Sequence, residues 1–221
     1  MKDVLLIGNT GGIGHALQQA FEVKGARVTG LSRRVHGFDL RDEAVVTEQL
    51  SNIETQFDIV FVATGALVSD HSRPEKSMSQ VSQAALIEQF TLNAVGPMLC
   101  LLHAKRLLKK EGNSIFAALS ARVGSIGDNR LGGWYSYRAS KAALNQLIHT
   151  GAIELQRTHP NSICVALHPG TVRTPLTSEF AKGHPTVSPQ DAAENLLRVL
   201  DSLSPSQSGQ FFDWAGKAVQ W

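Results

Sequence analysis

The sequence is poor in the features that mark secreted, nucleic-acid-binding and membrane-spanning proteins. It has only two cysteines in 221 residues, and both lie in apolar runs without metal-ligand spacing, which predicts reduced core thiols and no metal site. The formal net charge is +2, and the short basic cluster at 105–110 fits a solvated helix face. The apolar N-terminal stretch is too short for a membrane span and lacks a signal-peptide cleavage pattern. We therefore expect a cytoplasmic protein that binds neither nucleic acid nor membrane.

Short apolar runs alternate with longer helical patterns along the chain. Near-continuous apolar runs predict buried parallel strands at residues 3–8, 26–31, 35–38, 57–63, 114–119, 162–168 and 210–214. A helical period predicts helices at about 12–24, 42–52, 81–110, 134–157 and 189–202. The last of these begins well, with Ser188 as N-cap and Pro189 in the first turn.

This alternation predicts one α/β domain over residues 1–221. Its expected architecture is a doubly wound, Rossmann-type parallel sheet of about seven strands with helices on both faces. The connection at 171–188 is rich in Thr, Pro, Gly and Ser and is long for a compact domain, which is typical of a substrate loop.

The first predicted strand is followed by a glycine-rich turn, Gly8-Asn9-Thr10-Gly11-Gly12-Ile13-Gly14, that leads into a helix. Residues without Cβ allow a tight turn and let a pyrophosphate approach a helix N-terminus. Gly8 would close the turn, Gly12 would admit the phosphates, and Gly14 would let helix and strand pack closely. A merely tight turn is the alternative, but its position after the first strand of an α/β chain favours a dinucleotide.

The end of the second predicted strand indicates which dinucleotide. Dehydrogenases that prefer NAD usually carry an acidic residue here, which holds the ribose 2′-hydroxyl. This chain has Ser32, Arg33 and Arg34, and a hydroxyl with two guanidinium groups suits a 2′-phosphate. An exposed basic loop without a ligand is the alternative. We expect NADP(H) to be favoured over NAD(H).

Both tyrosines of the chain lie in the stretch YSYRASK at 135–141. On a helix, Tyr137 and Lys141 are four residues apart and share a face, whereas Tyr135 points elsewhere. A phenol beside an ammonium has a stabilised phenolate, so its proton is easier to give and take near neutral pH. Taken alone, the pair could also be a chance alignment on a surface helix.

The glycine turn, followed about a hundred and twenty residues later by Tyr137-x-x-x-Lys141, resembles the short-chain dehydrogenase/reductase family. The resemblance covers essentially the whole chain. The segments SARVGSI from Ser120, GGWYSYRASK up to Lys141 and GQFFDWAG from Gly209 are most similar to the C-factor and sniffer-like carbonyl reductase branch of that family.

The resemblance implies roles for individual residues. Tyr137 would be the general acid in carbonyl reduction, and Lys141 would lower the phenol pKa and hold the nicotinamide ribose. Asn93 matches an asparagine that supports a water-linked proton path, and it could also cap a local helix distortion. Asp39, followed by Leu40, matches a residue that contacts adenine, or it could belong to the N-cap region of the next helix. The resemblance adds further cofactor-binding residues, namely Ala63, Thr64, Gly65, Pro169, Gly170, Val172 and Thr174.

Two positions depart from the family's pattern. The family's Asn-Asn-Ala-Gly after the fourth strand reads VATG at 62–65, so Gly65 still permits close backbone approach and Thr64 could replace a lost amide hydrogen bond. The family's catalytic serine aligns with Ala121. Either Ser120 serves, or Ser125 substitutes from across the loop, or polarisation of the carbonyl is weakened. We favour Ser120 because it lies at the end of the strand that feeds the site. Arg122, Trp134 and Tyr135 could line the substrate entrance.

The leading hypothesis is an NADP-dependent oxidoreductase that transfers hydride between NADPH and a small-molecule carbonyl or alcohol, with Tyr137 as acid and base. The alternative is a cofactor-binding regulatory or signalling protein, like C-factor, with weak or incidental dehydrogenase activity. The intact set of Tyr137, Lys141 and Asn93 argues for the enzyme. The resemblance also implies homodimers or homotetramers that pair through the helices at 81–110 and 134–157.

Overall fold

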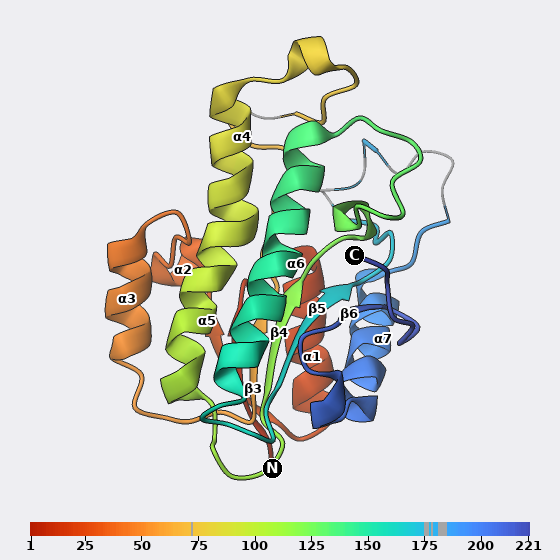
Figure 1. Ribbon diagram of the computed structural model, residues 1–221. Coiled ribbons are helices and arrows are strands. Elements are labelled where there is room, and N and C mark those ends of the chain that lie inside the picture. The colour runs from red at the N-terminus through yellow and green to blue at the C-terminus, as the bar shows by residue number, and fades with distance from the viewer. Residues whose placement is uncertain (72, 175–176, 178, 181–184) are drawn as a thin grey trace.

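The computed structural model describes residues 1–71, 73–174, 177, 179–180 and 185–221. Its strands form one parallel sheet in the order β2-β1-β3-β4-β5-β6 (Figure 1), and their bounds are Asp3–Ile7 (β1), Arg27–Leu31 (β2), Ile59–Val62 (β3), Ile115–Leu119 (β4), Ile163–His168 (β5) and Phe211–Asp213 (β6). The chain runs outward from β1 in both directions, to β2 on one side and to β3 on the other. Such a switch point opens a crevice at the carboxyl ends of the strands.

Helices cover both faces of the sheet, as the alternating sequence pattern predicts. Their bounds are Gly12–Val23 (α1), Arg33–His36 (α2), Glu43–Ser51 (α3), Gln83–Phe90 (α4), Gly96–Leu107 (α5), Tyr135–Leu155 (α6) and Pro189–Ser202 (α7). Figure 1 shows α3, α5 and α6 on the near face and α1 and α7 on the far face. The doubly wound Rossmann-type architecture is therefore confirmed.

Each central strand feeds two cores because successive side chains point to opposite faces. In β4, Phe116 and Ala118 join the core beneath α3, α5 and α6, whereas Ile115 and Ala117 join the core beneath α1 and α7. Both faces are covered, which explains why these strands read as continuous apolar runs instead of alternating ones.

The sheet has six strands in the described part of the chain, one fewer than expected. The prediction of a strand at 35–38 is wrong. Arg33–His36 forms the short helix α2 instead. The amide of His36 donates to the Ser32 carbonyl over 2.9 Å, and Gly37, with φ of +66°, ends the turn. A left-handed C-terminal residue is a common helix stop, and glycine adopts it without steric penalty.

The predicted helix at 81–110 is a continuous helical run with a distortion in its middle. α4 and α5 are joined by a π-helical segment, Thr91–Val95, which contains Asn93. The run Gln83–Leu107 is the one helix in the described residues that is long and apolar enough to cross a membrane. Contacts with α3, α6, β3 and β4 account for this composition within the fold.

Helix α7 begins where the sequence predicts. The side chain of Ser188 accepts from the Asp191 amide over 3.0 Å, the Asp191 carboxylate reaches back to the Ser188 amide, and Pro189 occupies the first turn. This reciprocal cap satisfies amides that would otherwise lack partners. The preceding loop, expected at 171–188, falls partly outside the described residues, at 175–176, 178 and 181–184.

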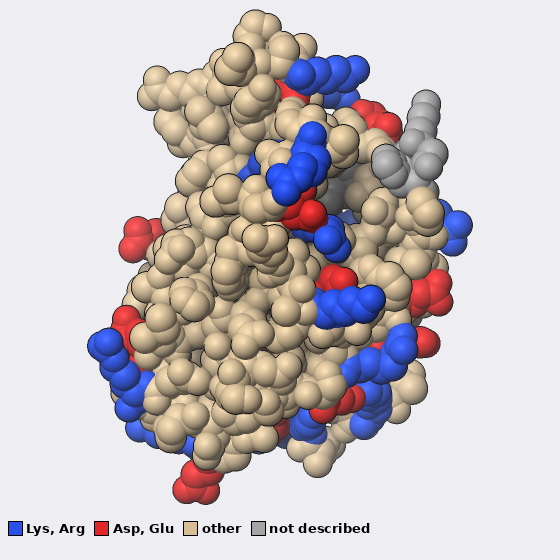
Figure 2. Space-filling model, turned by 45° about the vertical axis from the view of Figure 1, so that its right-hand side comes forward, with Lys and Arg blue, Asp and Glu red and all other residues tan. Residues whose placement is uncertain are grey.

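The charged side chains on the face in Figure 2 are of both signs and are interspersed, and the centre of this face carries few. The surface seen there has no extended patch of one sign. This distribution agrees with the small net charge of +2.

The junction of β1 and α1 should depend on the absence of a side chain at Gly14. A Cβ at Gly14 would lie 2.1 Å from the Gly8 carbonyl oxygen, whereas one at Gly11 would meet its nearest atom at 3.4 Å. We expect Gly14→Ala to lower the free energy of unfolding by about 1–3 kcal/mol, as overpacking does, and Gly11→Ala to cost less than about 1 kcal/mol. Urea denaturation measures both, and equal losses would contradict the packing described for Gly14.

Candidate active site

The glycine turn between β1 and α1 lies flush against two other segments. Gly8 has φ of +90° and donates its amide to the Leu31 carbonyl over 2.7 Å. A Cβ at Gly8 would lie 2.8 Å from the Thr64 methyl carbon, and one at Gly12 would lie 2.9 Å from that of Thr174. The turn thus joins the ends of β1, β2 and β3, and its glycines are required by close approach.

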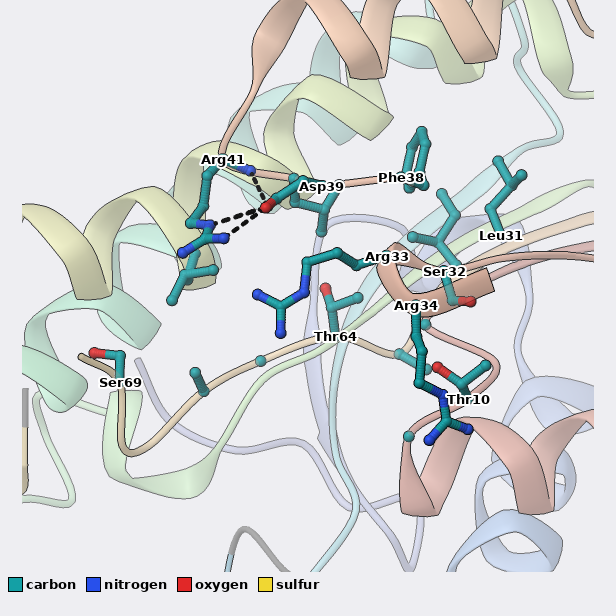
Figure 3. A pocket seen from close by; sticks show the side chains of 18 of the residues that line it. Thr10, Leu31, Ser32, Arg33, Arg34, Phe38, Asp39, Arg41, Thr64 and Ser69 are labelled. Carbon is teal, nitrogen blue, oxygen red and sulfur yellow. Dashed lines mark hydrogen bonds and ion pairs between the residues drawn. The ribbon is translucent and has the colours of Figure 1, made fainter. Parts of the chain in front are cut away.

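A cavity of about 540 Å³ opens at this switch point (Figure 3). Its lining includes the carboxyl ends of β1, β2 and β3, among them Gly8, Leu31 and Ala63. In Figure 3 the guanidinium groups of Arg33 and Arg34 project into the cavity from α2. Ser32, the residue before α2, lines the same wall and is buried. The structure therefore brings the predicted nucleotide-selecting residues together with the glycine turn.

Asp39 also lines this cavity but is paired with an arginine that the sequence reasoning missed. Arg41 holds the Asp39 carboxylate with both Nε, at 3.0 Å, and Nη2, at 2.6 Å. These hydrogen bonds hold the pKa of Asp39 below its ordinary value. The cap of α3 is Asp42, which accepts from the amides of Ala44 and Val45, so the N-cap alternative for Asp39 does not hold.

The end of β3 carries the stretch VATG at 62–65, the first of the two departures from the family's pattern. The hydroxyl of Thr64 is buried and has no hydrogen-bond partner within the described residues, so it does not replace the missing amide contact inside the protein. Gly65 lies close to two other site candidates, since a Cβ there would lie 3.2 Å from Lys141 Nζ and 3.3 Å from Asn93 Oδ1, and its close approach to a cofactor stays a prediction. Gly65 is thus the point where the cavity meets the lysine and the asparagine.

Tyr137 and Lys141 lie one turn apart on α6, as the spacing predicts. Lys141 is only 2 % exposed, and its Nζ donates to the Leu119 carbonyl at the end of β4 over 2.9 Å. The same nitrogen lies 5.9 Å from the centre of the Tyr137 ring. Tyr135 points elsewhere and is 37 % exposed, which separates the two tyrosines into a site residue and a surface residue.

Burial dominates the ionisation of this pair in the chain itself. It lowers the pKa of Lys141 to about 7 and raises the pKa of the Tyr137 phenol above its ordinary value. Poor solvation disfavours the charged form of each group, which explains the opposite signs. The pKa of Tyr137 is thus raised by burial in this structure, and its lowering by Lys141 stays a prediction.

Asn93 connects three parts of the site from the π-helical segment. Its Oδ1 accepts from the Ala66 amide over 2.9 Å, and its Nδ2 donates to the Ala66 carbonyl over 2.8 Å. The same amide nitrogen contacts Gln89 at 2.6 Å and Ser140 at 3.2 Å. Gln89 and Ser140 were not predicted, although Ser140 lies within the quoted YSYRASK stretch. The distortion foreseen for Asn93 is present, and this network fixes the segment after β3 to α6.

The two candidate serines, Ser120 and Ser125, differ in the hydrogen bonds that their hydroxyls make. The Ser120 hydroxyl, at the end of β4, donates to Asn145 Oδ1 on α6 over 2.6 Å. Ser125 Oγ accepts from the Asp128 amide over 3.1 Å, which leaves its own proton uncommitted to that contact. Ala121 provides no hydroxyl. A carbonyl oxygen must therefore compete with Asn145 for the proton of Ser120.

The predicted cofactor-binding residues after β5 do not line the cavity, but one of them contacts the glycine turn. Gly170 has φ of +82°, and the Trp214 indole would lie 3.1 Å from a Cβ there. Val172 is buried, and the Thr174 methyl faces Gly12 across the turn. Thr174 thus joins this stretch to the glycine turn, whereas Gly170 packs against the segment after β6.

Of the residues expected at the entrance, Trp134 packs against Tyr137. Its ring meets the Tyr137 ring edge-on at 6.2 Å and the Phe180 ring at 5.8 Å. Arg122 is instead engaged by Asp128, with Nε 2.5 Å from Oδ2. His168 has its pKa lowered to about 4, mainly by burial, so it is neutral at pH 7.

Comparison with known proteins agrees with this arrangement. A family described as enoyl-(acyl carrier protein) reductase matches residues 7–202. The 1-hydroxy-2-glutathionyl-2-methyl-3-butene dehydrogenase of Rhodococcus sp. (strain AD45) is 31 % identical over 100 % of both chains. C-signal of Myxococcus xanthus is 34 % identical over 66 % of this chain and 84 % of its own.

Two solved carbonyl reductases share the fold. Sniffer of D. melanogaster superposes with a TM-score of 0.81 at 21 % identity and covers 100 % of both chains. An NADPH-bound carbonyl reductase from chicken fatty liver gives the same TM-score and identity, covering 100 % of this chain and 94 % of its own. On the strength of the family match over residues 7–202 and of the full-length relative, the chain belongs to the short-chain dehydrogenase/reductase family of oxidoreductases.

Proposed function

We propose that this oxidoreductase reduces a small-molecule carbonyl with NADPH, or oxidises the corresponding alcohol, with Tyr137 as the general acid and base. The observation that carries the proposal is the placement of Tyr137 and Lys141 on one face of α6, with Lys141 Nζ buried beside Gly65 and Asn93. Gly65 also lines the 540 Å³ cavity, so the coenzyme crevice and the dyad adjoin.

The residues of the cavity fit a nicotinamide dinucleotide phosphate. The Thr64 hydroxyl is buried there without a partner among the residues that the structure describes, and the glycine turn leaves no room for side chains where a pyrophosphate would approach. Arg33 and Arg34 supply positive charge at the end of β2, where a 2′-phosphate would be held. The NADPH-bound reductase that shares the fold supports the same choice of coenzyme.

When bound, NADPH would supply a hydride to the carbonyl carbon. Tyr137 would donate its phenolic proton to the carbonyl oxygen as negative charge develops there. The ammonium form of Lys141, 5.9 Å from the ring centre, stabilises the phenolate that remains. Asn93 and Ser140 hold the first turns of α6 against the segment after β3. No metal takes part in this scheme.

Ser120 is the proposed hydrogen-bond donor to the substrate oxygen. It lies at the end of β4, and its hydroxyl would have to turn from Asn145 toward the substrate. Ser125 is the alternative donor. Removal of one donor to a developing oxyanion typically costs about 3 kcal/mol, so alanine substitution of each serine should show which of the two hydroxyls is the donor.

A second candidate function is that of a cofactor-binding regulatory or signalling protein with weak dehydrogenase activity. It is favoured because the Ser120 hydroxyl already donates to Asn145 and because Ala121 has no hydroxyl, and the similarity to C-signal supports considering it. Tight NADPH binding without turnover over a panel of aldehydes, ketones and quinones would favour this second function over the reductase.

Tyr137→Phe removes the proton donor but keeps the ring against Trp134. We expect kcat for NADPH-dependent carbonyl reduction to fall about 10²- to 10⁴-fold, while NADPH still binds, because general acid catalysis contributes on that scale. Tyr135→Phe, at the exposed neighbouring tyrosine, serves as the matched control and should keep wild-type kcat. Equal activity of the two variants would refute the role given to Tyr137.

Arg34→Ala and Arg33→Ala test the coenzyme preference. Loss of a charge-assisted hydrogen bond to the 2′-phosphate should weaken NADPH binding by about 1.5–3 kcal/mol, which raises its Kd roughly 10- to 150-fold, for the arginine that makes it. The Kd for NADH should change little, because NADH lacks the phosphate. Fluorescence titration measures both constants, and parallel changes in the two would count against a 2′-phosphate site.

A further inference from the structure

The segment that leads into α6 has an unusual backbone. Gly132, Gly133 and Trp134 follow one another with φ of +62°, +65° and +54°. Residues with a Cβ rarely adopt this left-handed conformation, and Trp134 is the one non-glycine residue in the described part of the chain that does so. Conformations of this kind persist only where the surroundings hold them, and they concentrate at functional sites.

Helix α6 also begins without a cap of its own. Trp134 occupies the N-cap position, and its side chain makes no capping hydrogen bond. The first amides of a helix have no partner within the helix, and Tyr137 is in its first turn. The helix that carries the proposed acid therefore needs an acceptor from elsewhere in the fold.

Glu75 provides that acceptor from 61 residues earlier in the chain. Its carbonyl oxygen accepts from the Trp134 amide over 2.6 Å. One carboxylate oxygen accepts from the Ser136 amide over 3.3 Å, and the other accepts from the Ser136 hydroxyl. Glu75 is only 4 % exposed, although it lies on a surface connection between β3 and α4.

The carboxylate is well placed by its charge as well as by its contacts. Buried carboxylates are costly unless they are paired or hydrogen-bonded, and no lysine or arginine among the described residues forms an ion pair with Glu75. The N-terminus of a helix carries partial positive charge and favours an anion. The start of α6 thus supplies the compensation for this buried group.

We propose that Glu75 is a positioning residue of the reaction: it caps α6 across the fold and holds the left-handed turn at Trp134, so that Tyr137 is presented in its working position. This proposal rests on the function proposed for Tyr137. Trp134 meets the Tyr137 ring edge-on at 6.2 Å, so the same contacts also hold the aromatic wall beside the acid.

The cap should act on Tyr137 and not on Lys141. Tyr137 belongs to the turn whose amides Glu75 engages, whereas Lys141 lies one turn further on and is anchored separately, by Leu119 on β4. The Arg33 and Arg34 side chains lie on α2, in the cavity at the far side of Gly65. Loss of the cap should therefore impair the proton transfer far more than the binding of coenzyme.

The test compares Glu75→Ala, Glu75→Gln and Lys76→Ala in the full chain, with Tyr137→Phe in parallel. For Glu75→Ala we expect kcat to fall about 100-fold, as for a misplaced catalytic group, with Kd for NADPH within about threefold of wild type. Glu75→Gln should stay within about fivefold of wild-type kcat, since its amide can accept from the Ser136 amide and donate to the Ser136 hydroxyl. Lys76→Ala, at the exposed neighbour, should behave as wild type.

Hydrogen exchange gives a readout that does not depend on turnover. In Glu75→Ala the amides of Trp134 and Ser136 should exchange faster, with little change around Lys141. If Glu75→Ala does not fold, Ser136→Ala removes one donor to the carboxylate, and it should lower kcat about tenfold at unchanged Kd for NADPH.

The outcomes separate the two proposals. An inactive Tyr137→Phe beside a Glu75→Ala variant with wild-type kcat and wild-type exchange would overturn the cap but not the reductase. Parallel losses of kcat and of NADPH affinity in Glu75→Ala, or in Ser136→Ala where that variant replaces it, would mark a general structural role and overturn the cap as well. A fully active Tyr137→Phe would overturn the proposed function. The exchange data would then decide only whether Glu75 holds the amides of Trp134 and Ser136.

Discussion

The contact between the Lys141 amine and the Leu119 carbonyl joins the two parts on which the site depends. It ties α6, which carries Tyr137, to the carboxyl end of β4, and it does so at a point where only 2 % of the lysine is exposed. Gly65 can lie close to this nitrogen because it has no side chain, since a Cβ there would lie 3.2 Å from Lys141 Nζ. A buried amine is tolerated only with a hydrogen-bond partner, which here is the Leu119 carbonyl.

Around this contact the fold brings a cavity close to α6. The parallel sheet places the ends of β1, β2 and β3 around this cavity with arginines at one wall, and Gly65 in its lining lies close to Lys141 on α6. The glycine turn packs against two neighbouring segments, since a Cβ at Gly8 would meet Thr64 and one at Gly12 would meet Thr174. Close packing at the glycine turn, together with the hydrogen bonds of Lys141 and Asn93, therefore sets how the cavity lies relative to Tyr137 and Lys141.

Much of this could be predicted from the sequence, because the signals are local. The glycine spacing, the i and i+4 relation of Tyr137 and Lys141, the continuous apolar strands and the Ser188 cap each follow from backbone periodicity or steric demand. The short helix α2 was mistaken for a strand because Val35 and Phe38 are apolar, while hydrogen bonds around Ser32 and the left-handed Gly37 decide the conformation.

The parts that could not be predicted are mainly contacts between residues distant in the chain. Asn145 binds Ser120 from 25 residues away and Glu75 binds Ser136 from 61 residues away, so both contacts depend on which elements the fold brings together. The pairing of Arg41 with Asp39, two residues apart, is local, but no motif in the sequence marks it. The segment around Glu75 has the sequence of a polar surface loop, so nothing in the sequence indicates that its carboxylate is buried.

The most direct test of this account is the pKa of the Lys141 amine, measured by NMR of lysine-labelled protein over pH, with Lys141→Met to assign the signal. We predict a midpoint near 7, because burial against β4 disfavours the charged form, so the amine loses its proton as the pH rises through neutrality. A midpoint near the ordinary 10.5 would mean that the amine is solvated, and would contradict the buried junction on which the site depends.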